Sequence, residues 1–372
     1  MTLNIKVTPN LSDITLLQRE CTYTVGTDII SHLPKTLVMP VSGQAMTAQI
    51  GILLNLVNSG YKPKLTLGAS GGAMVAANAV QVGWDAEKWK KELDNICDTN
   101  VLRKHYLGYI QALQLPYLFN KGSGLESYYK LITSAHPDEY RNNEIIINAY
   151  NTSVGQTELF TTATSSCSVL SATQGPLNYL GVSGKVHFLG DLPNCEFRKT
   201  FEQILRATSA VPVVFDQVSF RGCYYADGGV SFSSPLTAVN SLVSLTDILY
   251  INPENIDKCL PTTYSNIFDN TVAFTSQITR SNALQDRYMF LLSLCCGRFE
   301  RFKVINGEVL GNDSQQFDAN LIKTKAHPRL VELYPIEGKS LTMLDTQSRH
   351  EHIRNITVCN NHFGYRIFYL CD

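Results

Sequence analysis

Short β-rich runs alternate with helical patterns along most of this chain, and this alternation restricts the fold more than any other feature of the sequence. The expected strands lie at 35–41, 64–67, 144–150, 158–162, 186–189, 222–226 and 247–251. Expected helices lie between them at 47–59, 86–96 and 125–131. Such alternation is typical of a largely parallel sheet with helices on both faces, so we expect an α/β fold.

Other local signals mark the borders of helices and domains. Ser123 with Glu126, and Thr200 with Gln203, have capping-box spacing and predict helix starts. Apolar residues recur at helical spacing over 267–294, which predicts one or two helices closing the domain. From residue 296 the pattern loosens into polar turns, including Asn306-Gly307, before an apolar finish at 365–370. We therefore expect a leader at 1–34, a main domain at 35–295 and a peripheral extension at 296–372.

Composition limits the partners that this chain can have. A length of 372 residues fits one large domain with appendages, and 31 basic against 32 acidic residues provide no overall field for nucleic acid or anionic membranes. The sequence predicts neither a signal peptide nor a transmembrane segment, and its ten cysteines form no C-x-x-C pair. We expect a cytoplasmic or intracellular protein with reduced thiols, whose contact with a membrane is peripheral and local.

The segment LTLGASGGAMVAANAV contains the first chemistry-bearing motif. A predicted strand ends at Leu67, the turn Gly68-Ala69-Ser70-Gly71-Gly72 follows, and an Ala-rich helix begins. Such an elbow exposes a serine at the start of a helix, where amide groups can stabilise an oxyanion. A structural glycine-rich turn or a phosphate-binding loop is the alternative, but no lysine follows the glycines as a nucleotide P-loop requires.

The second motif is Asp227-Gly228-Gly229, which follows a short β-like stretch in FRGCYYADGGVSFSSPL. A carboxylate at the end of a strand can accept the proton of Ser70 if the two side chains meet. Alone, an Asp-Gly pair is more often a structural turn than a catalytic one.

Together these motifs closely resemble those of patatin-like phospholipases. The resemblance spans about residues 36–253 and rests on GASGG, the distant ADGG, ILRATSAVPVVF and the hairpin-like NAYNTSVGQTELF. It implies a three-layer α/β/α fold with a central mostly parallel sheet. It also implies a serine carboxylic-ester hydrolase that cleaves phospholipid or neutral lipid through an acyl-enzyme. Ser70 would be the nucleophile and Asp227 the general base, and no histidine would take part.

The loop that would form the oxyanion hole departs from this family. The family pattern is G-G-G-x-[RK]-G, whereas this chain has Val41-Ser42-Gly43-Gln44-Ala45-Met46. The backbone amides of Gly43, Gln44 and Ala45 remain candidates, and Ser42 or Gln44 could add a side-chain donor. A catalytically weak or inactive protein that binds lipid or a partner is therefore the alternative.

A conventional triad esterase is the third interpretation, with Asp191 or Asp227 as the acid. Its histidine would be one of His327, His350, His352 and His362. Because His350-Glu-His352 lacks a third ligand, we expect no metal, and no motif implies a diffusible cofactor. The apolar stretch 105–119 could line an acyl channel or touch a membrane, or form a buried helix.

Overall fold

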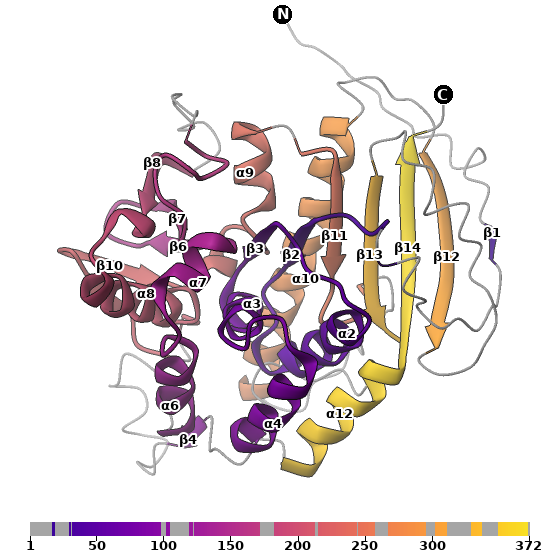
Figure 1. Ribbon diagram of the computed structural model, residues 1–372, viewed down its shortest axis with the longest axis horizontal. Coiled ribbons are helices and arrows are strands. Elements are labelled where there is room, and N and C mark those ends of the chain that lie inside the picture. Colours follow the sequence, from indigo (N-terminus) through magenta and orange to yellow (C-terminus); the bar gives the residue numbers. More distant parts are fainter. Residues whose placement is uncertain are drawn as a thin grey trace, which may run out of the picture.

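The computed structural model describes residues 17–18, 30, 32–97, 102–104, 119–121, 123–171, 182–212, 215–243, 245–256, 267–294, 302–310, 329–336 and 349–370. Its main sheet has the strand order β1-β12-β14-β13-β11-β2-β3-β6-β10-β9, and β7 and β8 continue from β6 (Figure 1). These strands are β1 Leu17–Gln18, β2 Thr36–Met39, β3 Leu65–Gly68, β6 Glu144–Asn151, β7 Gln156–Thr161, β8 Val182–Phe188, β9 Val218–Phe220, β10 Cys223–Ala226, β11 Asp247–Ile251, β12 Phe302–Leu310, β13 Arg329–Pro335 and β14 His362–Leu370. A separate ribbon pairs β4 Leu102–Lys104 with β5 Phe119–Lys121.

The centre of the sheet is parallel. Each neighbouring pair from β13 through β11, β2 and β3 to β6 runs parallel. Antiparallel strands flank this centre, with β14 and β12 on one side and β10, β9 and β7 on the other. The expected α/β fold with a mostly parallel central sheet is confirmed.

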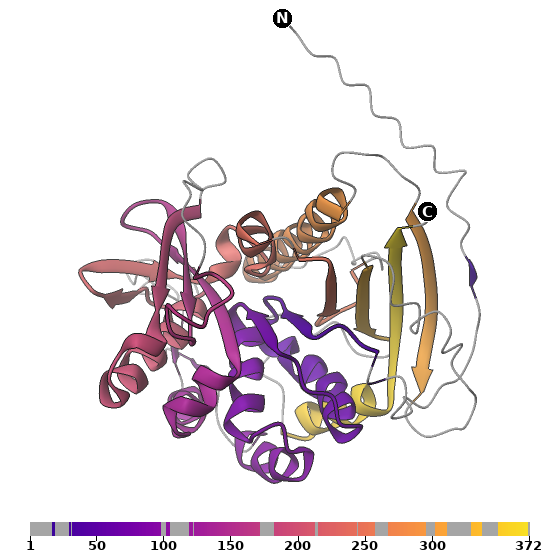
Figure 2. The same ribbon diagram turned by 45° about the horizontal axis from the view of Figure 1, so that its top comes forward.

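Helices cover both faces of the sheet, which gives three layers (Figure 2). Successive strand residues point to opposite faces, so Leu37 and Met39 of β2 join one core cluster and Val38 joins the other. The first face carries α2 Met46–Asn58, α3 Ser70–Gln81, α4 Ala86–Cys97, α6 Ser123–Ile132, α7 Pro137–Asn142, α8 Asn194–Thr208 and α12 Arg349–Asn361; the second carries α9 Leu236–Leu242 and α10 Ile267–Leu294.

Two local predictions from the sequence were wrong. The Thr200 and Gln203 signal does not start a helix, because α8 already begins at Asn194 after Pro193 and buries Thr200 in its interior. Asn306-Gly307 is not a turn, because both residues lie inside β12 and pair with β14. Cross-strand pairing therefore overrides the turn preference of an Asn-Gly pair there.

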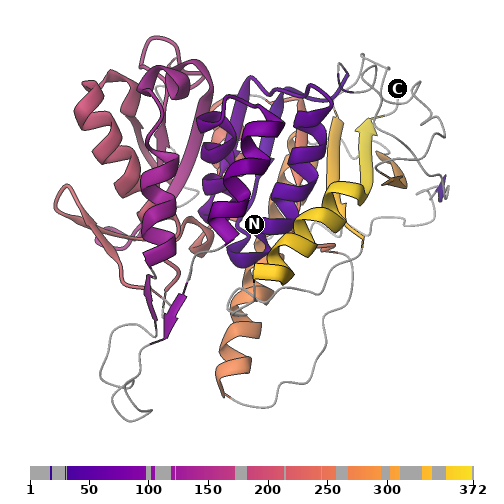
Figure 3. The ribbon, with the colours of Figure 1, turned by 60° about the horizontal axis from the view of Figure 1, so that its bottom comes forward.

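The described residues after 296 add strands and a helix to this architecture. β13 pairs directly with the central strand β11, and β14 pairs with β13. Helix α12 lies against α2 (Figure 3), and Asn55 of α2 donates a hydrogen bond to the Asn360 carbonyl oxygen at 2.6 Å. The division at residue 296 stays a prediction. None of the helices in the described part of the chain combines the length and apolar character that crossing a bilayer requires.

Candidate active site

Ser70 stands at the junction between β3 and α3. The strand ends at Gly68, Ala69 is extended, and Ser70 begins the helix with a φ of 50°. This left-handed conformation is strained for a residue with a side chain and is the backbone geometry of a nucleophile elbow. The serine is buried, with 2% of its surface exposed.

The glycines around Ser70 are required by close backbone contacts. A Cβ atom at Gly68 would lie 2.7 Å from the Ala73 Cα atom, and one at Gly72 would lie 2.2 Å from the Met39 carbonyl oxygen. At Gly71, a Cβ atom would lie 2.5 Å from the Ser42 Oγ atom. The absence of these side chains lets α3 approach the end of β2 and the loop that follows it.

The register of the sheet brings the two predicted motifs together along the same edge of β6, because β7 pairs along its other edge. In the parallel pair, Gly68 lies beside Ile147, so Ala69 follows in line with Asn148. In the antiparallel pair, Ala226 lies beside Tyr150, so the chain reaches Gly228 opposite the same Asn148. A Cβ atom at Gly228 would in fact lie 2.4 Å from the Asn148 carbonyl oxygen. Asn148 is thus the meeting point of the two motifs.

A chain of hydrogen bonds joins Ser70 to the Asp-Gly-Gly segment. The Ser70 N–H group donates to the Thr208 hydroxyl at 2.9 Å, and that hydroxyl donates to the Asn148 carbonyl oxygen at 2.8 Å. The Asn148 side-chain amide then donates to the Gly228 carbonyl oxygen at 3.1 Å. Thr208 and Asn148 are completely buried, so their bonds fix the elbow relative to Asp227 without competition from water.

Asp227 follows β10 directly and caps the short 3-10 helix η5, Gly228–Val230. Its carboxylate Oδ1 accepts the Gly229 N–H at 2.7 Å, and its own N–H donates to the Ala210 carbonyl oxygen at 2.9 Å. The residue is 3% exposed. A carboxylate held this way is a suitable base for a serine hydroxyl, because its position is fixed by the backbone.

The loop after β2 lies beside both motifs. It forms the 3-10 helix η2, Gly43–Ala45, and the Gly43 nitrogen would be 3.2 Å from a Cβ atom at Gly71. The Ala45 N–H donates to the Ser42 carbonyl oxygen at 2.9 Å. The Ala45 amide is therefore already engaged, whereas Gly43 and Gln44 lie in the first turn, where N–H groups have no acceptor within the helix.

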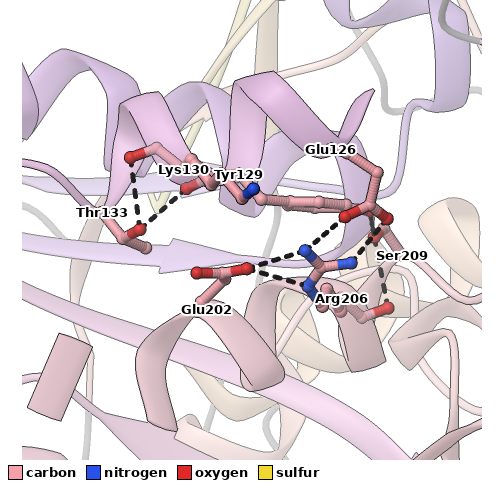
Figure 4. Close-up of polar contacts among 7 residues, drawn as sticks. All are labelled: Glu126, Tyr129, Lys130, Thr133, Glu202, Arg206 and Ser209. Carbon is pink, nitrogen blue, oxygen red and sulfur yellow. Dashed lines mark hydrogen bonds and ion pairs between the residues drawn. The ribbon is translucent and has the colours of Figure 1, made fainter. Parts of the chain in front are cut away.

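A network of charged and aromatic groups supports the end of α8 that carries Thr208 (Figure 4). Arg206 donates to Glu202 at 2.7 Å and to Glu126 of α6 at 2.5 Å, and its guanidinium lies 5.0 Å from the centre of the Tyr129 ring. The Tyr129 hydroxyl bonds to Ser209, next to Thr208. Burial raises the pKa of Tyr129 far above its usual value, so this phenol stays neutral. Glu126, predicted as part of a capping box, thus acts as a partner of Arg206.

The histidines of the alternative triad lie elsewhere in the fold or outside the described residues. His352 belongs to α12 and His362 begins β14, which is separated from β3 by β13, β11 and β2. His350 lies in α12, while His327 and most of the stretch 105–119 fall outside the described residues. Asp191 accepts the Ser165 N–H at 3.0 Å. Among the described residues, no group of three potential ligands could hold a metal ion.

Sequence reasoning assigned no role to Asn148 or Thr208. Both lie in segments that carry the family resemblance, and this was the only feature of the sequence that could have pointed to them. Their function depends on the pairing of β6 with β3 and β10, which no local pattern encodes.

Comparison with known proteins gives one family. A family model described as patatin-like phospholipase matches residues 42–239, more than half of the chain. No curated protein matches the chain. Among solved structures, the chain is similar to VipD from Legionella pneumophila, with 12% identity and a TM-score of 0.36. The match covers 87% of this chain and 65% of that one, so this chain spans less than two thirds of its length.

Proposed function

The chain belongs to the patatin-like phospholipase family, and from this premise we propose that it is a lipid acyl hydrolase in which Ser70 and Asp227 form a catalytic dyad. One observation carries the proposal. Ser70 occupies a strained elbow that buried hydrogen bonds through Thr208 and Asn148 connect to the segment of Asp227. Strain of this kind persists only where the surroundings enforce it, and it gathers at functional sites.

In the proposed mechanism, Asp227 takes the Ser70 proton as Oγ attacks the acyl carbonyl carbon. The tetrahedral intermediate collapses, the C–O bond to the glycerol alcohol breaks, and the protonated Asp227 returns its proton to that leaving oxygen. A water molecule then gives a proton to Asp227 and attacks the acyl-enzyme. Ser70 is released with its proton restored, and the fatty acid leaves.

The substrate in this proposal is a phospholipid or a neutral lipid with a fatty-acyl ester. Membership of the family supports a lipid substrate. The proposed reaction of serine and carboxylate needs no diffusible cofactor. Action inside the cell, with the lipid met at a membrane surface, is part of the same proposal.

A catalytically weak protein that binds lipid or a partner is the second candidate, and the loop after β2 favours it. This loop lacks three of the four glycines and the basic residue of the family pattern, and the Ala45 N–H is engaged by the Ser42 carbonyl oxygen. Loss of one oxyanion donor typically lowers the rate by about 10²–10³-fold. The two candidates therefore differ in turnover and agree on fold.

Fluorophosphonate labelling of the purified full chain separates these candidates. The parent protein is compared with Ser70→Ala and Asp227→Asn, and fatty-acid release is then measured on phospholipid and triacylglycerol. We expect labelling and release in the parent and loss of both in each variant. A folded parent that shows neither signal would support the binding protein.

Two further sets of variants serve as controls. Ser134→Ala and Asp138→Asn change an exposed serine and an exposed aspartate and should retain full labelling. Replacement of His327, His350, His352 and His362 one at a time with Ala should leave ester cleavage intact. Loss of cleavage in one folded histidine variant would establish the triad instead.

A further inference from the structure

Ser42 occupies a position where the family pattern has glycine. In the alignment of Val41–Met46 on G-G-G-x-[RK]-G, Ser42 stands at the second glycine. It lies in the loop between β2 and η2, immediately before the candidate oxyanion amides of Gly43 and Gln44. This chain therefore places a hydroxyl group where the pattern has only backbone.

The Ser42 hydroxyl is buried without a hydrogen-bond partner among the residues that the structure describes. Ser42 is 4% exposed, and its Oγ atom forms no hydrogen bond with any of the described residues. A buried polar group left unsatisfied destabilises the fold, so such groups call for an explanation. A bound substrate oxygen that accepts a hydrogen bond from this hydroxyl would provide one.

The hydroxyl also lies beside the residue that follows the nucleophile. The Ser42 Oγ atom is 2.5 Å from the place where a Cβ atom of Gly71 would stand. In nucleophile elbows, the N–H of the residue after the nucleophile is an oxyanion donor. The Ser42 hydroxyl therefore adjoins that donor, in space that glycine at position 71 leaves open.

The backbone on both sides of Ser42 is fixed. Before it, the Val41 N–H donates to the Ser233 carbonyl oxygen at 2.8 Å. After it, the Ser42 carbonyl oxygen accepts the Ala45 N–H at 2.9 Å. The second bond engages the Ala45 N–H, so Ala45 is no longer a free donor. Together the two bonds fix the backbone from which the Ser42 side chain extends, which favours a preorganised donor.

We propose that the Ser42 hydroxyl is a side-chain donor of the oxyanion hole and replaces donors that the altered loop has lost. The inference rests on the proposed function, because an oxyanion forms only if Ser70 attacks an ester. The hydroxyl forms no covalent bond and gives up no proton. It donates a hydrogen bond to the oxygen on which negative charge develops.

The experiment measures kcat and KM of the full chain on a p-nitrophenyl fatty-acyl ester, and inhibition by a fatty-acyl trifluoromethyl ketone, whose adduct with a serine has an oxyanion. Ser42→Ala and Ser42→Cys are compared with the parent. We expect each variant to lower kcat by about 10²–10³-fold, while its KM stays within a few-fold of the parent value. Inhibition by the ketone should weaken by a factor similar to the fall in kcat. Cysteine has the same shape as serine with a somewhat larger terminal atom, and it is a weak donor, so together with alanine it separates hydrogen bonding from the loss of a side-chain atom.

Ser233→Ala is the matched control, because Ser233 is buried on the segment that binds Val41. It should retain the parent kcat. Full activity of Ser42→Cys would overturn the donor role, and it would also serve as the folded variant if Ser42→Ala did not fold. A parent with neither turnover nor labelling would instead refute the proposed function, and the role of Ser42 with it.

Discussion

Ser70 combines a buried side chain with a φ of 50°, a conformation that glycine adopts freely and serine does not. Ser70→Gly should therefore relieve strain and raise the free energy of unfolding by about 1 kcal/mol, while abolishing labelling. Ser70→Ala loses the hydroxyl but retains the strain, so it should show no such gain. Urea unfolding of the three proteins measures this difference. Equal stability of the Ala and Gly variants would show that the elbow stores no strain.

Asp286 of α10 gives the fold a pH dependence. Burial raises the pKa of this carboxyl to about 7, although Ser234 and Thr237 donate hydrogen bonds to it at 2.8 Å. Because the folded pKa exceeds the usual value of 3.8, the folded chain binds more protons between these two values. The stabilisation is complete below about pH 4 and is lost as the pH rises to about 7.

Asp286→Asn should remove this contribution. The free energy of unfolding, measured by urea at intervals from pH 4 to 8, should fall less steeply in the variant than in the parent. Asp138→Asn is the control, since Asp138 is exposed on α7. Parallel curves for the parent and Asp286→Asn would contradict the raised pKa.

At the scale of elements, α8 connects the two candidate motifs through Thr208. Thr208→Val removes the hydroxyl and leaves the Ser70 N–H and the Asn148 carbonyl oxygen unsatisfied. We expect a loss of about 1–3 kcal/mol in stability, and a fall of about 10–100-fold in kcat/KM because the elbow shifts relative to Asp227. Thr208→Ser retains the hydroxyl, so its stability and its kcat/KM should stay close to those of the parent. Equal activity of the Val and Ser variants would show that this bond does not position the nucleophile.

Most elements of the central sheet could be predicted from the sequence because their signals are local. The run 247–251 coincides with β11, and the expected helix at 47–59 differs from α2 by one residue at each end. β13 was not predicted, although it pairs with β11. Its sequence, RLVELYP, carries charges at Arg329 and Glu332, and only ion pairs with distant residues allow these to be buried.

The candidate site also combines residues that the sequence predicts with residues that it does not. Ser70 and Asp227 stand in short motifs whose glycines are visible in the sequence, and the structure places both at strand ends. The burial of the Ser42 hydroxyl depends on how the loop before η2 packs against α3, where its Oγ atom lies beside Gly71. Such contacts join residues that are distant in sequence, so no pattern within either segment could reveal them.

At the scale of the whole molecule, Glu332 connects three elements through buried ion pairs. This residue of β13 is 1% exposed and accepts two bonds of 2.6 Å from Arg287 of α10, and it lies 3.5 Å from Arg366 of β14. β13 in turn pairs with β11, which pairs with β2 beside the candidate site. The strands after residue 296 are thus continuous with the sheet that carries the elbow, which favours a single unfolding unit.

Glu332→Gln tests this continuity. Removing one charge from a buried ion pair lowers the free energy of unfolding by about 3–5 kcal/mol, because the remaining charges lose their counterion. Glu87→Gln is the control, since it affects only an exposed pair with Lys90 and should lower that free energy by less than about 1 kcal/mol. Trp84 and Trp89 are the two tryptophans of the chain, and both are buried near α4, so their fluorescence reports on the main domain. In Glu332→Gln, thermal unfolding by fluorescence and by far-UV circular dichroism should shift down together. An unchanged fluorescence transition would mean that residues 296–372 unfold separately, as a peripheral extension would.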